Sequence, residues 1–201
     1  MAQTTCVLLI GASGAFGSRL AEGLAREPGL SLVLAGRRRA PLERLADRLA
    51  APGQGRPLVA VADRLSLSAV DLSEVDVVID AAGPYRREET AVVKAAIAAR
   101  CHYLDLADGR AFVAAITAFE TAAREASVAV LSGASTTPAL SHAVLDKLTE
   151  GWRRVDRLTV AVCPGNRARA VSRWSVQSCR TSVGRCACFA TALGPARRAG
   201  G

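Results

Sequence analysis

Apolar residues recur along the first 150 residues in two alternating spacings. Continuous apolar runs of strand length are separated by segments whose apolar residues lie three or four positions apart, such as Leu42, Leu45 and Leu49. Runs that are apolar on both faces and are joined by helices are typical of a buried parallel sheet. We therefore predict a doubly wound parallel α/β sheet with right-handed crossovers. The expected strands are 6–11, 30–36, 57–63, 75–83, 102–107 and 127–133.

The pattern changes after about residue 150. Residues 155–165 alternate apolar and polar positions, which favours an antiparallel strand in a different sheet. We assign 1–150 to a first α/β domain, 151–168 to the start of an incomplete second α/β domain, and 169–201 to a tail. The strand at 155–163 would lack partners, and because unpaired strand edges promote association, a homodimer is a further expectation.

The positive charge of the chain is concentrated near its C-terminus. The net charge is +8, from 26 basic and 18 acidic residues, yet 167–201 contains seven arginines and no acid. The first 166 residues therefore hold 19 basic side chains (26 less 7) against 18 acidic ones. Because this body is nearly neutral, we expect no nucleic acid partner.

Hydropathy and cysteine use indicate a cellular compartment. No apolar run approaches the roughly 18 residues of a membrane span, and "MAQTTCVLLIGASG" lacks the basic flank and cleavage site of a signal peptide. We expect a cytoplasmic protein without a membrane partner, whose cysteines are free thiols. Aromatic residues make up only 4% of the chain, so the core must consist mainly of Ala, Val and Leu.

A glycine-rich segment, "GASGAFG", links the first expected strand to a helix. The strand–loop–helix context is typical of a dinucleotide site and identifies 1–150 as an NAD(P)-binding domain. Gly11 permits the sharp turn, Gly14 allows a pyrophosphate to approach the backbone, and Gly17 lets the helix pack closely. The helix N-terminus offers free N–H groups to the phosphates. A tight turn without a ligand is the alternative. The candidate cofactor residues of this loop are Gly11, Ser13, Gly14, Ala15, Phe16 and Gly17.

The end of the second expected strand indicates which dinucleotide binds. An NAD site usually carries an acid there for the ribose 2′-hydroxyl. This chain reads "AGRRR", so Gly36 takes the place of the acid, and Arg37 and Arg38 supply guanidinium groups suited to a 2′-phosphate. NADP(H) is therefore favoured over NAD(H). A solvated, basic helix start is the alternative for Arg39.

Further candidates lie at the ends of the third, fourth and fifth strands. Asp63 could accept a hydrogen bond from the adenine amine or cap a helix, and Tyr85 could stack on a ring or belong to the core. Asp105 stands where such folds place ligands, and Asp108 could cap a helix. Small residues beside the nicotinamide would allow close backbone contact. The candidates of the fourth strand end are Ala82, Gly83, Pro84 and Tyr85.

Catalytic residues are not identified by the sequence. A short-chain dehydrogenase needs Tyr-x-x-x-Lys, but neither Tyr85 nor Tyr103 has a lysine four residues on. His142 could face the cleft or lie on a helix surface. No pattern indicates a metal site in the first 166 residues.

Four motifs in order resemble one family. "LIGASGAFGSRLAEGLA", "VVIDAAGPY", "HYLDLADG" and "SGASTTPALS" are similar to the NADP-binding domain of saccharopine dehydrogenase-like oxidoreductases, over residues 5 to about 168. The resemblance implies a Rossmann-type domain, a second α/β domain with the pocket for a small-molecule substrate, and hydride transfer to or from a carbonyl, imine or enoyl group. The alternative is a non-catalytic NADP(H)-binding regulatory or interaction module.

The tail departs from this pattern and contains Cys179, Cys186 and Cys188. Zinc would require a fourth ligand, a nucleic-acid arm would have interleaved aromatics, and plain disorder is a third reading. A frameshift accounts for the tail better, because reading a GC-rich gene one nucleotide earlier can restore a helical period and a strand and remove the cysteines. We expect residues from about 168 onward to form no stable structure and carry no site.

Overall fold

A computed structural model of the chain describes residues 4–50, 55–162 and 189–193. The chain divides into two units, Met1–Ala139 and Leu140–Gly201. The first unit contains a six-stranded parallel sheet, and the second contains a helix and an antiparallel strand pair. The boundary between the units, at residues 139 and 140, precedes the change of sequence pattern at about residue 150.

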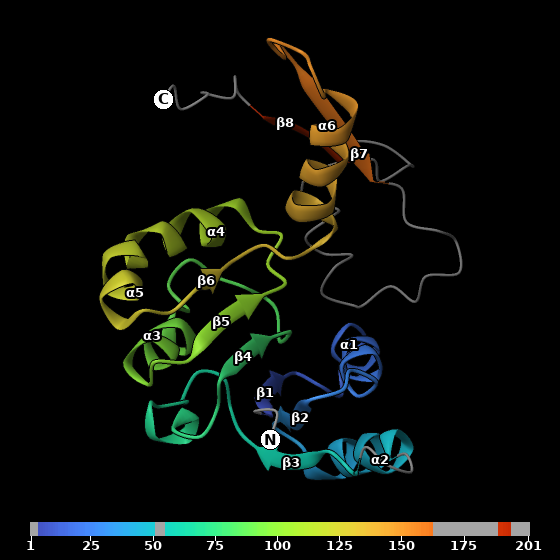
Figure 1. The fold of residues 1–201 in the computed structure, drawn as a ribbon, viewed down its shortest axis with the longest axis vertical. Coiled ribbons are helices and arrows are strands. Elements are labelled where there is room, and N and C mark those ends of the chain that lie inside the picture. Colours follow the sequence, from blue (N-terminus) through green and yellow to red (C-terminus); the bar gives the residue numbers. More distant parts are fainter. Residues whose placement is uncertain (1–3, 51–54, 163–188, 194–201) are drawn as a thin grey trace. The chain divides into compact units, whose positions relative to one another are not determined.

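The sheet of the first unit confirms the predicted doubly wound fold. Its strand order is β3-β2-β1-β4-β5-β6 and each neighbouring pair is parallel (Figure 1). The chain therefore runs outward in one direction from β1 and returns to run outward in the other from β4. The strands are β1 (Thr5–Ile10), β2 (Leu30–Gly36), β3 (Leu58–Val61), β4 (Val77–Asp80), β5 (His102–Asp105) and β6 (Val130–Leu131).

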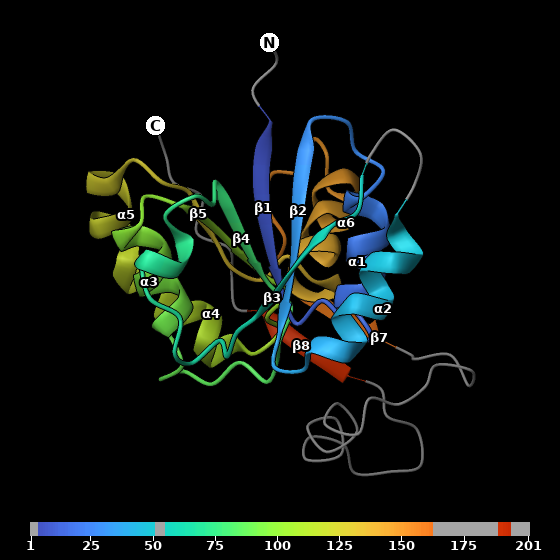
Figure 2. The same ribbon diagram turned by 90° about the horizontal axis from the view of Figure 1, so that it is seen from below.

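Helices cover both faces of this sheet. Figure 2 shows α1 and α2 on one face, and α3, α4 and α5 on the other. A 3₁₀ turn, η2 (Thr117–Phe119), interrupts the helical segment that follows β5. The other elements are α1 (Gly17–Leu24), α2 (Arg39–Leu49), η1 (Val70–Leu72), α3 (Ala91–Ala98), α4 (Arg110–Ile116) and α5 (Glu120–Ala126).

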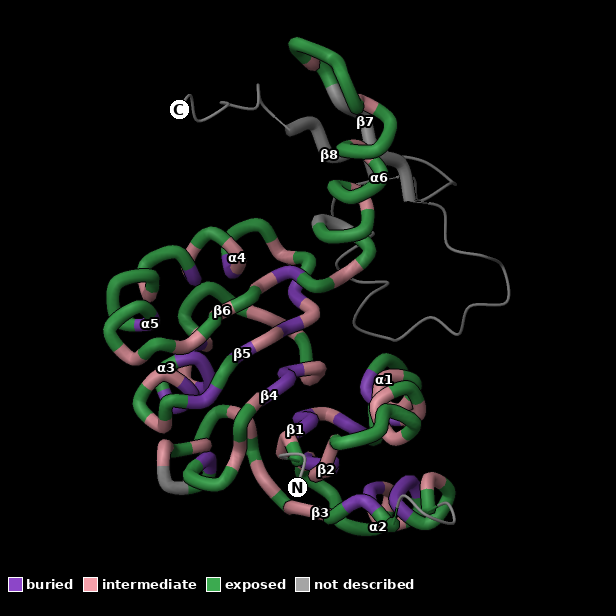
Figure 3. The backbone as a smooth tube through the Cα atoms, viewed as in Figure 1, coloured by how far each residue is buried: buried purple, intermediate pink, exposed green. Residues whose placement is uncertain are grey.

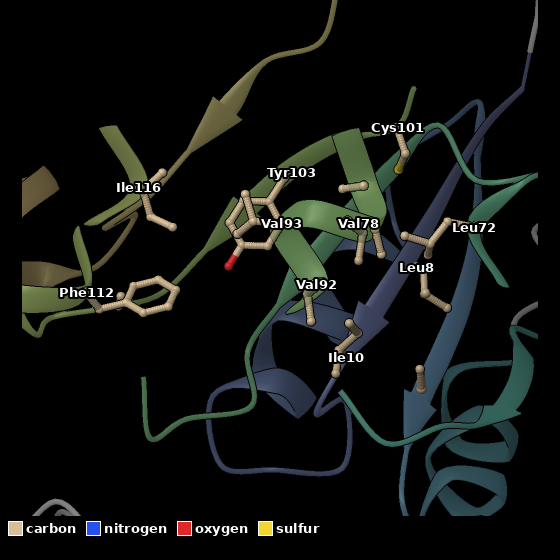
Figure 4. Close-up of a cluster of buried hydrophobic side chains, with 14 residues drawn as sticks. Leu8, Ile10, Leu72, Val78, Val92, Val93, Cys101, Tyr103, Phe112 and Ile116 are labelled. Carbon is tan, nitrogen blue, oxygen red and sulfur yellow. The ribbon is translucent and has the colours of Figure 1, made fainter. Parts of the chain in front are cut away.

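Each face of the sheet has its own apolar core because successive side chains of a strand point to opposite faces. On β1, Leu8 and Ile10 belong to the core beneath α3 and α4 (Figure 4). The residues that precede these two, Val7 and Leu9, belong to the core beneath α1 and α2. Figure 3 shows buried residues concentrated on the central strands, while the outward sides of the helices are exposed. The alternation places the central strands between two cores, as predicted for a parallel sheet.

The second unit contains the expected antiparallel strand. A helical turn, η3 (Thr136–Leu140), leads into α6 (Ser141–Leu148), and β7 (Leu158–Val162) pairs antiparallel with β8 (Phe189–Leu193). This pairing differs from the expectation of an unstructured tail at 189–193. The segment "FATAL" alternates large and small residues and contains Phe and Thr, which favour strands, so it can form a ladder. The other tail residues, with Cys179, Cys186 and Cys188, lie outside the described residues.

None of the helices in the described part of the chain is both long enough and apolar enough to cross a membrane.

Candidate functional site

The candidate site lies at the carboxyl ends of β1 and β4. These strands are neighbours, and from them the chain continues to opposite sides of the sheet. The loops that follow them therefore lead to opposite faces of the sheet, and in open α/β sheets ligands bind at such a point. Residues 11–17 follow β1 and residues 81–85 follow β4. The glycine loop and the "AAGPY" segment are thus brought to the same point of the sheet.

Gly11 makes a turn that no other residue can make without strain. Its φ is +76°, in the left-handed region. A Cβ on Gly11 would lie 2.9 Å from the Cβ of Ala82 and 3.0 Å from the carbonyl oxygen of Ala81. The loop after β1 therefore packs directly against the loop after β4.

Gly17 allows α1 to begin against this turn. A Cβ on Gly17 would lie 2.2 Å from the carbonyl oxygen of Gly11 and 2.9 Å from the Cα of Ala12. Both obstacles are backbone, which cannot swing aside. A Cβ on Gly14 would lie 3.1 Å from the same oxygen of Gly11, while the N–H of Gly14 donates to that oxygen at 2.9 Å. The glycine spacing is therefore required by the packing of the turn itself.

The outer part of the loop is open. Ser13, Gly14, Ala15 and Phe16 are all exposed, and Phe16 keeps 60% of its surface. Within the described residues no side chain caps the N-terminus of α1, and its first turn contains no acid. The positive end of the helix dipole is therefore not neutralised locally, which favours an anion.

The end of β2 presents arginines rather than a carboxylate. Gly36 ends the strand, and Arg37 and Arg38 follow it as exposed residues. Arg38 stands at the N-cap position of α2 with an extended backbone, φ −124°. Arg39 forms an ion pair with Glu43 at 3.2 Å, whereas Arg37 and Arg38 have no carboxylate partner among the described residues. Two positive charges thus remain available where the sequence predicts them.

A cavity of about 200 Å³ lies between the glycine loop, α1 and α2. It is lined by Ser13, Ser18, Pro41, Arg44, Leu45 and Arg48. Of these residues, only Ser13 was predicted from the sequence to contact the cofactor. The α2 members recur three or four positions apart, so they share one face of that helix.

Arg64 forms the centre of a buried network on the other side of the site. Its side chain is 10% exposed, and its Nε donates to Asp80 Oδ2 at 3.1 Å. Its Nη1 donates to the carbonyl oxygen of Pro84 at 2.9 Å and to Glu89 Oε2 at 3.1 Å. One guanidinium therefore joins the end of β3 to the end of β4 and to the turn before α3. Sequence analysis missed Arg64, which reads as an ordinary loop arginine.

Tyr85 points into this network. Its hydroxyl donates to the backbone oxygen of Asp80 at 2.7 Å, and its ring lies 5.3 Å from the Arg64 guanidinium and 5.4 Å from the Phe112 ring. Burial, followed by the carboxylates of Asp80 and Asp105, raises the pKa of Tyr85 well above its usual value. The phenol is therefore neutral, and the ring is a packed part of the core. A stacking role toward a ligand stays a prediction.

Two carboxylates end adjacent strands in register, and both are fully buried. Asp80 of β4 pairs with Asp105 of β5. Asp80 Oδ1 accepts from the N–H of Ala82 at 2.9 Å, and burial raises the pKa of Asp80 although Arg64 opposes that change. Asp105 Oδ1 accepts from three donors at 2.9–3.0 Å, which are the N–H of Ala107, the hydroxyl of Ser132 and the N–H of Gly133. These carboxylates therefore hold the backbone of the loops after β4 and β6 in place.

The remaining candidates, Asp63 and His142, are exposed. Asp63 is exposed, and its Oδ1 accepts from the N–H of Leu65 at 3.0 Å, a local turn contact. An adenine contact for Asp63 stays a prediction. His142 is exposed on α6, and His102 Nδ1 accepts from the N–H of Ala129 at 3.0 Å. In the described ranges, no group of three His, Cys, Asp or Glu residues could hold a metal ion.

Comparison with known proteins identifies the family. Residues 7–150 match the model of the saccharopine dehydrogenase NADP binding domain. The search of curated proteins found no match. Saccharopine dehydrogenase (L-Glu forming) from Saccharomyces cerevisiae is a similar solved structure, with TM-score 0.64 and 22% identity over 81% of this chain and 36% of that one. The chain thus spans about a third of that enzyme.

Two further solved structures share the fold. GenD2 from gentamicin A biosynthesis, in complex with NAD, has TM-score 0.52 and 22% identity over 75% of this chain and 40% of that one. A β-ketoacyl-[ACP] reductase from Bacteroides thetaiotaomicron has TM-score 0.50 and 18% identity over 65% and 75%. These identities show the fold alone. The family match covers more than half of the chain, so the protein belongs to the saccharopine dehydrogenase NADP-binding domain family, whose cofactor is NADP and whose fold is that of the Rossmann oxidoreductases.

Proposed function

We propose that the carboxyl edge of the first unit binds NADP(H), with the pyrophosphate on the glycine loop and the 2′-phosphate beside Arg37 and Arg38. The single observation that carries this proposal is the exposed loop 13–16 in front of an uncapped helix whose first turn lacks acid. Free N–H groups and a positive dipole end favour phosphate there. Two arginines without carboxylate partners among the described residues add charge-assisted donors for a phosphate monoester.

Residues 82–85 form the proposed wall beside the nicotinamide ring. Ala82 and Gly83 carry little or no side chain, so a flat ring can approach their backbone closely. Pro84 and Tyr85 are fixed from behind by Arg64 and Asp80. The wall is therefore rigid before a ligand arrives, which reduces the ordering that binding requires.

The proposed activity of the whole enzyme is oxidoreduction. NADP(H) supplies hydride transfer at its nicotinamide when bound, and the protein positions cofactor and substrate. The substrate class is a small molecule with a carbonyl, imine or enoyl group that accepts the hydride and takes up a proton, or the corresponding reduced form. The substrate pocket would be supplied by the second domain.

A second candidate function is an NADP(H)-binding module without chemistry. The observation that favours it is the burial of Asp80 and Asp105, the two acids at the ends of β4 and β5. Both side chains are fully buried in the described structure, so they are poorly placed to exchange a proton with a substrate. The first unit would then hold the cofactor, and acid–base groups would have to come from another part of an active enzyme.

Titration of the chain with NADPH and NADH, followed by cofactor fluorescence, tests the binding proposal. We expect NADPH to bind at least tenfold more tightly, and equal affinity or no binding would contradict the proposal. NADPH oxidation with a panel of carbonyl and imine compounds separates the two candidate functions. Turnover, by this chain or by a version with the reading frame restored after residue 168, supports the enzyme, whereas tight binding without turnover by both supports the module.

A further inference from the structure

The arginines of α2 differ in how their charge is neutralised. Arg39 pairs with Glu43 at 3.2 Å, and Arg48 pairs with Glu22 of α1 at 3.1 Å. Arg44 lies between them on the same helix and has no carboxylate partner in the described part of the chain. Arg44 is exposed, and it lines the cavity together with Ser13 of the glycine loop. The cavity thus contains one guanidinium whose charge is not matched.

The lining of the cavity suits a phosphate group. Besides Arg44, the lining includes two residues that carry hydroxyls, Ser13 and Ser18, and no residue that carries a carboxylate. A phosphate monoester needs several donors and a compensating positive charge, and a guanidinium fork supplies both. Leu45 and Pro41 complete the walls, so the donors are presented from a partly apolar recess.

The position of the cavity indicates which phosphate of the cofactor would enter. Ser13 belongs to the glycine loop, but Arg44 belongs to α2, the helix that directly follows β2. In this fold the end of β2 faces the adenosine ribose, while the pyrophosphate lies on the backbone of the glycine loop and the start of α1. A group held between Ser13 and α2 therefore lies on the ribose side of the loop.

We infer that Arg44, assisted by the Ser13 hydroxyl, is a specificity-determining contact for the 2′-phosphate of NADP(H), in addition to Arg37 and Arg38. This inference rests on the proposed binding of NADP(H). Arg44 lies seven residues beyond Arg37 in the chain, within α2. The helix therefore fixes the backbone of Arg44, whereas Arg37 belongs to the loop after β2. Loss of Arg44 should weaken binding of the 2′-phosphorylated nucleotide and leave the unphosphorylated one unchanged.

The experiment measures dissociation constants of NADPH, NADH, 2′,5′-ADP and 5′-ADP for the unmodified chain, Arg44→Gln, Arg44→Lys and Arg124→Gln. Arg124→Gln removes the same charge from α5 on the opposite face of the sheet, where Arg124 is 79% exposed. For Arg44→Gln we expect about tenfold or greater weakening toward NADPH and 2′,5′-ADP, as for loss of a charged hydrogen bond. We expect partial rescue by Arg44→Lys, which keeps the charge but not the planar fork.

Each result decides the inference. Selective loss for Arg44→Gln, with NADH and 5′-ADP unchanged and Arg124→Gln like the unmodified chain, supports it. If NADPH binds tightly and Arg44→Gln weakens it no more than Arg124→Gln does, the role of Arg44 is wrong and the proposed function stands. If the unmodified chain binds neither dinucleotide nor 2′,5′-ADP, both are wrong. Thermal unfolding of Arg44→Gln should match the unmodified chain, because Arg44 is exposed.

Discussion

The two loops that meet at the candidate site are shaped in opposite ways. The loop after β1 depends on the absence of side chains, since a Cβ at Gly11 or Gly17 would meet backbone at 3.0 Å or 2.2 Å. The loop after β4 depends on buried side chains, because Arg64 holds Asp80, Glu89 and the carbonyl oxygen of Pro84. The first leaves an open surface for phosphates, and the second provides a fixed wall.

This difference determines how each loop can be broken. An added methyl group disrupts the first loop by collision, whereas a removed guanidinium disrupts the second by leaving buried charge unpaired. Substitutions that add atoms should therefore destabilise the loop after β1, and substitutions that remove a charged group should destabilise the loop after β4.

Replacement of Arg64 by Met should have the largest effect on stability. The substitution keeps most of the volume but leaves the fully buried Asp80 without its cation, which costs about 3–5 kcal/mol of unfolding free energy. Urea denaturation followed by circular dichroism measures this loss. The matched control is Arg86→Met, because Arg86 also pairs with Glu89, at 3.7 Å, but is 66% exposed.

An exposed pair of this kind contributes about 1 kcal/mol or less. Equal losses for Arg64→Met and Arg86→Met would contradict the assignment of Arg64 as the centre of the wall.

Replacement of Gly17 by Ala should destabilise the first loop by about 1–3 kcal/mol or more, the usual cost of overpacking. Helix propensity alone predicts the opposite, because Ala is preferred over Gly within a helix by about 1 kcal/mol. Gly23 lies on the same helix, and a Cβ added there meets nothing within 4 Å. Gly23→Ala should therefore stabilise the chain. If differential scanning calorimetry finds Gly17→Ala as stable as Gly23→Ala, the close contact with Gly11 is not present.

Removal of both Arg37 and Arg38 should affect cofactor choice more than stability. Both side chains are exposed, so the Ala–Ala variant should unfold at nearly the same temperature. Each charged hydrogen bond to a phosphate contributes about 1.5–3 kcal/mol, so NADPH binding should weaken at least tenfold while NADH binding is kept. Isothermal titration calorimetry with both nucleotides makes the comparison. Equal weakening toward both would show that these arginines do not contact the 2′-phosphate.

The pH dependence of the unfolding free energy should show whether folding raises the pKa of the Asp80 carboxyl. Burial raises the pKa of Asp80 above its ordinary 3.8, so the folded protein holds this proton more tightly than the unfolded chain does. The contribution of Asp80 is therefore fully present below pH 3.8 and is lost as pH rises through its folded pKa. Compared with Asp80→Asn, the unmodified chain should lose stability as pH rises above 3.8. A relative gain over that range would mean that Arg64 outweighs burial.

The sequence predicted those features that arise from regular spacing. Apolar runs such as 30–36 are buried strands at the expected positions, because a parallel sheet needs both faces covered. The glycine loop was predicted for the same kind of reason, since Gly11 and Gly17 occupy positions where geometry excludes other residues.

Features that depend on pairing across the fold were not predicted. Arg64 has the local sequence of a solvated loop residue, and only the fold shows that Asp80 and Glu89, 16 and 25 positions away, surround it. Similarly, α3 begins only at Ala91, because the residues before it form a turn that carries Glu89 to Arg64. The proposed phosphate contact of Arg44 likewise depends on the fold, because only the structure shows that Arg39 and Arg48 pair with carboxylates.

Hydrogen–deuterium exchange of the chain, with and without saturating NADPH, shows directly where the cofactor binds. Bound phosphates should engage the N–H groups at the start of α1, so we predict slower exchange in peptides covering 11–18 and 36–45. Peptides covering α5 should not change. Protection confined to other parts of the chain, or no protection at NADPH concentrations that saturate binding, would contradict the assignment of the cofactor site to this edge of the sheet.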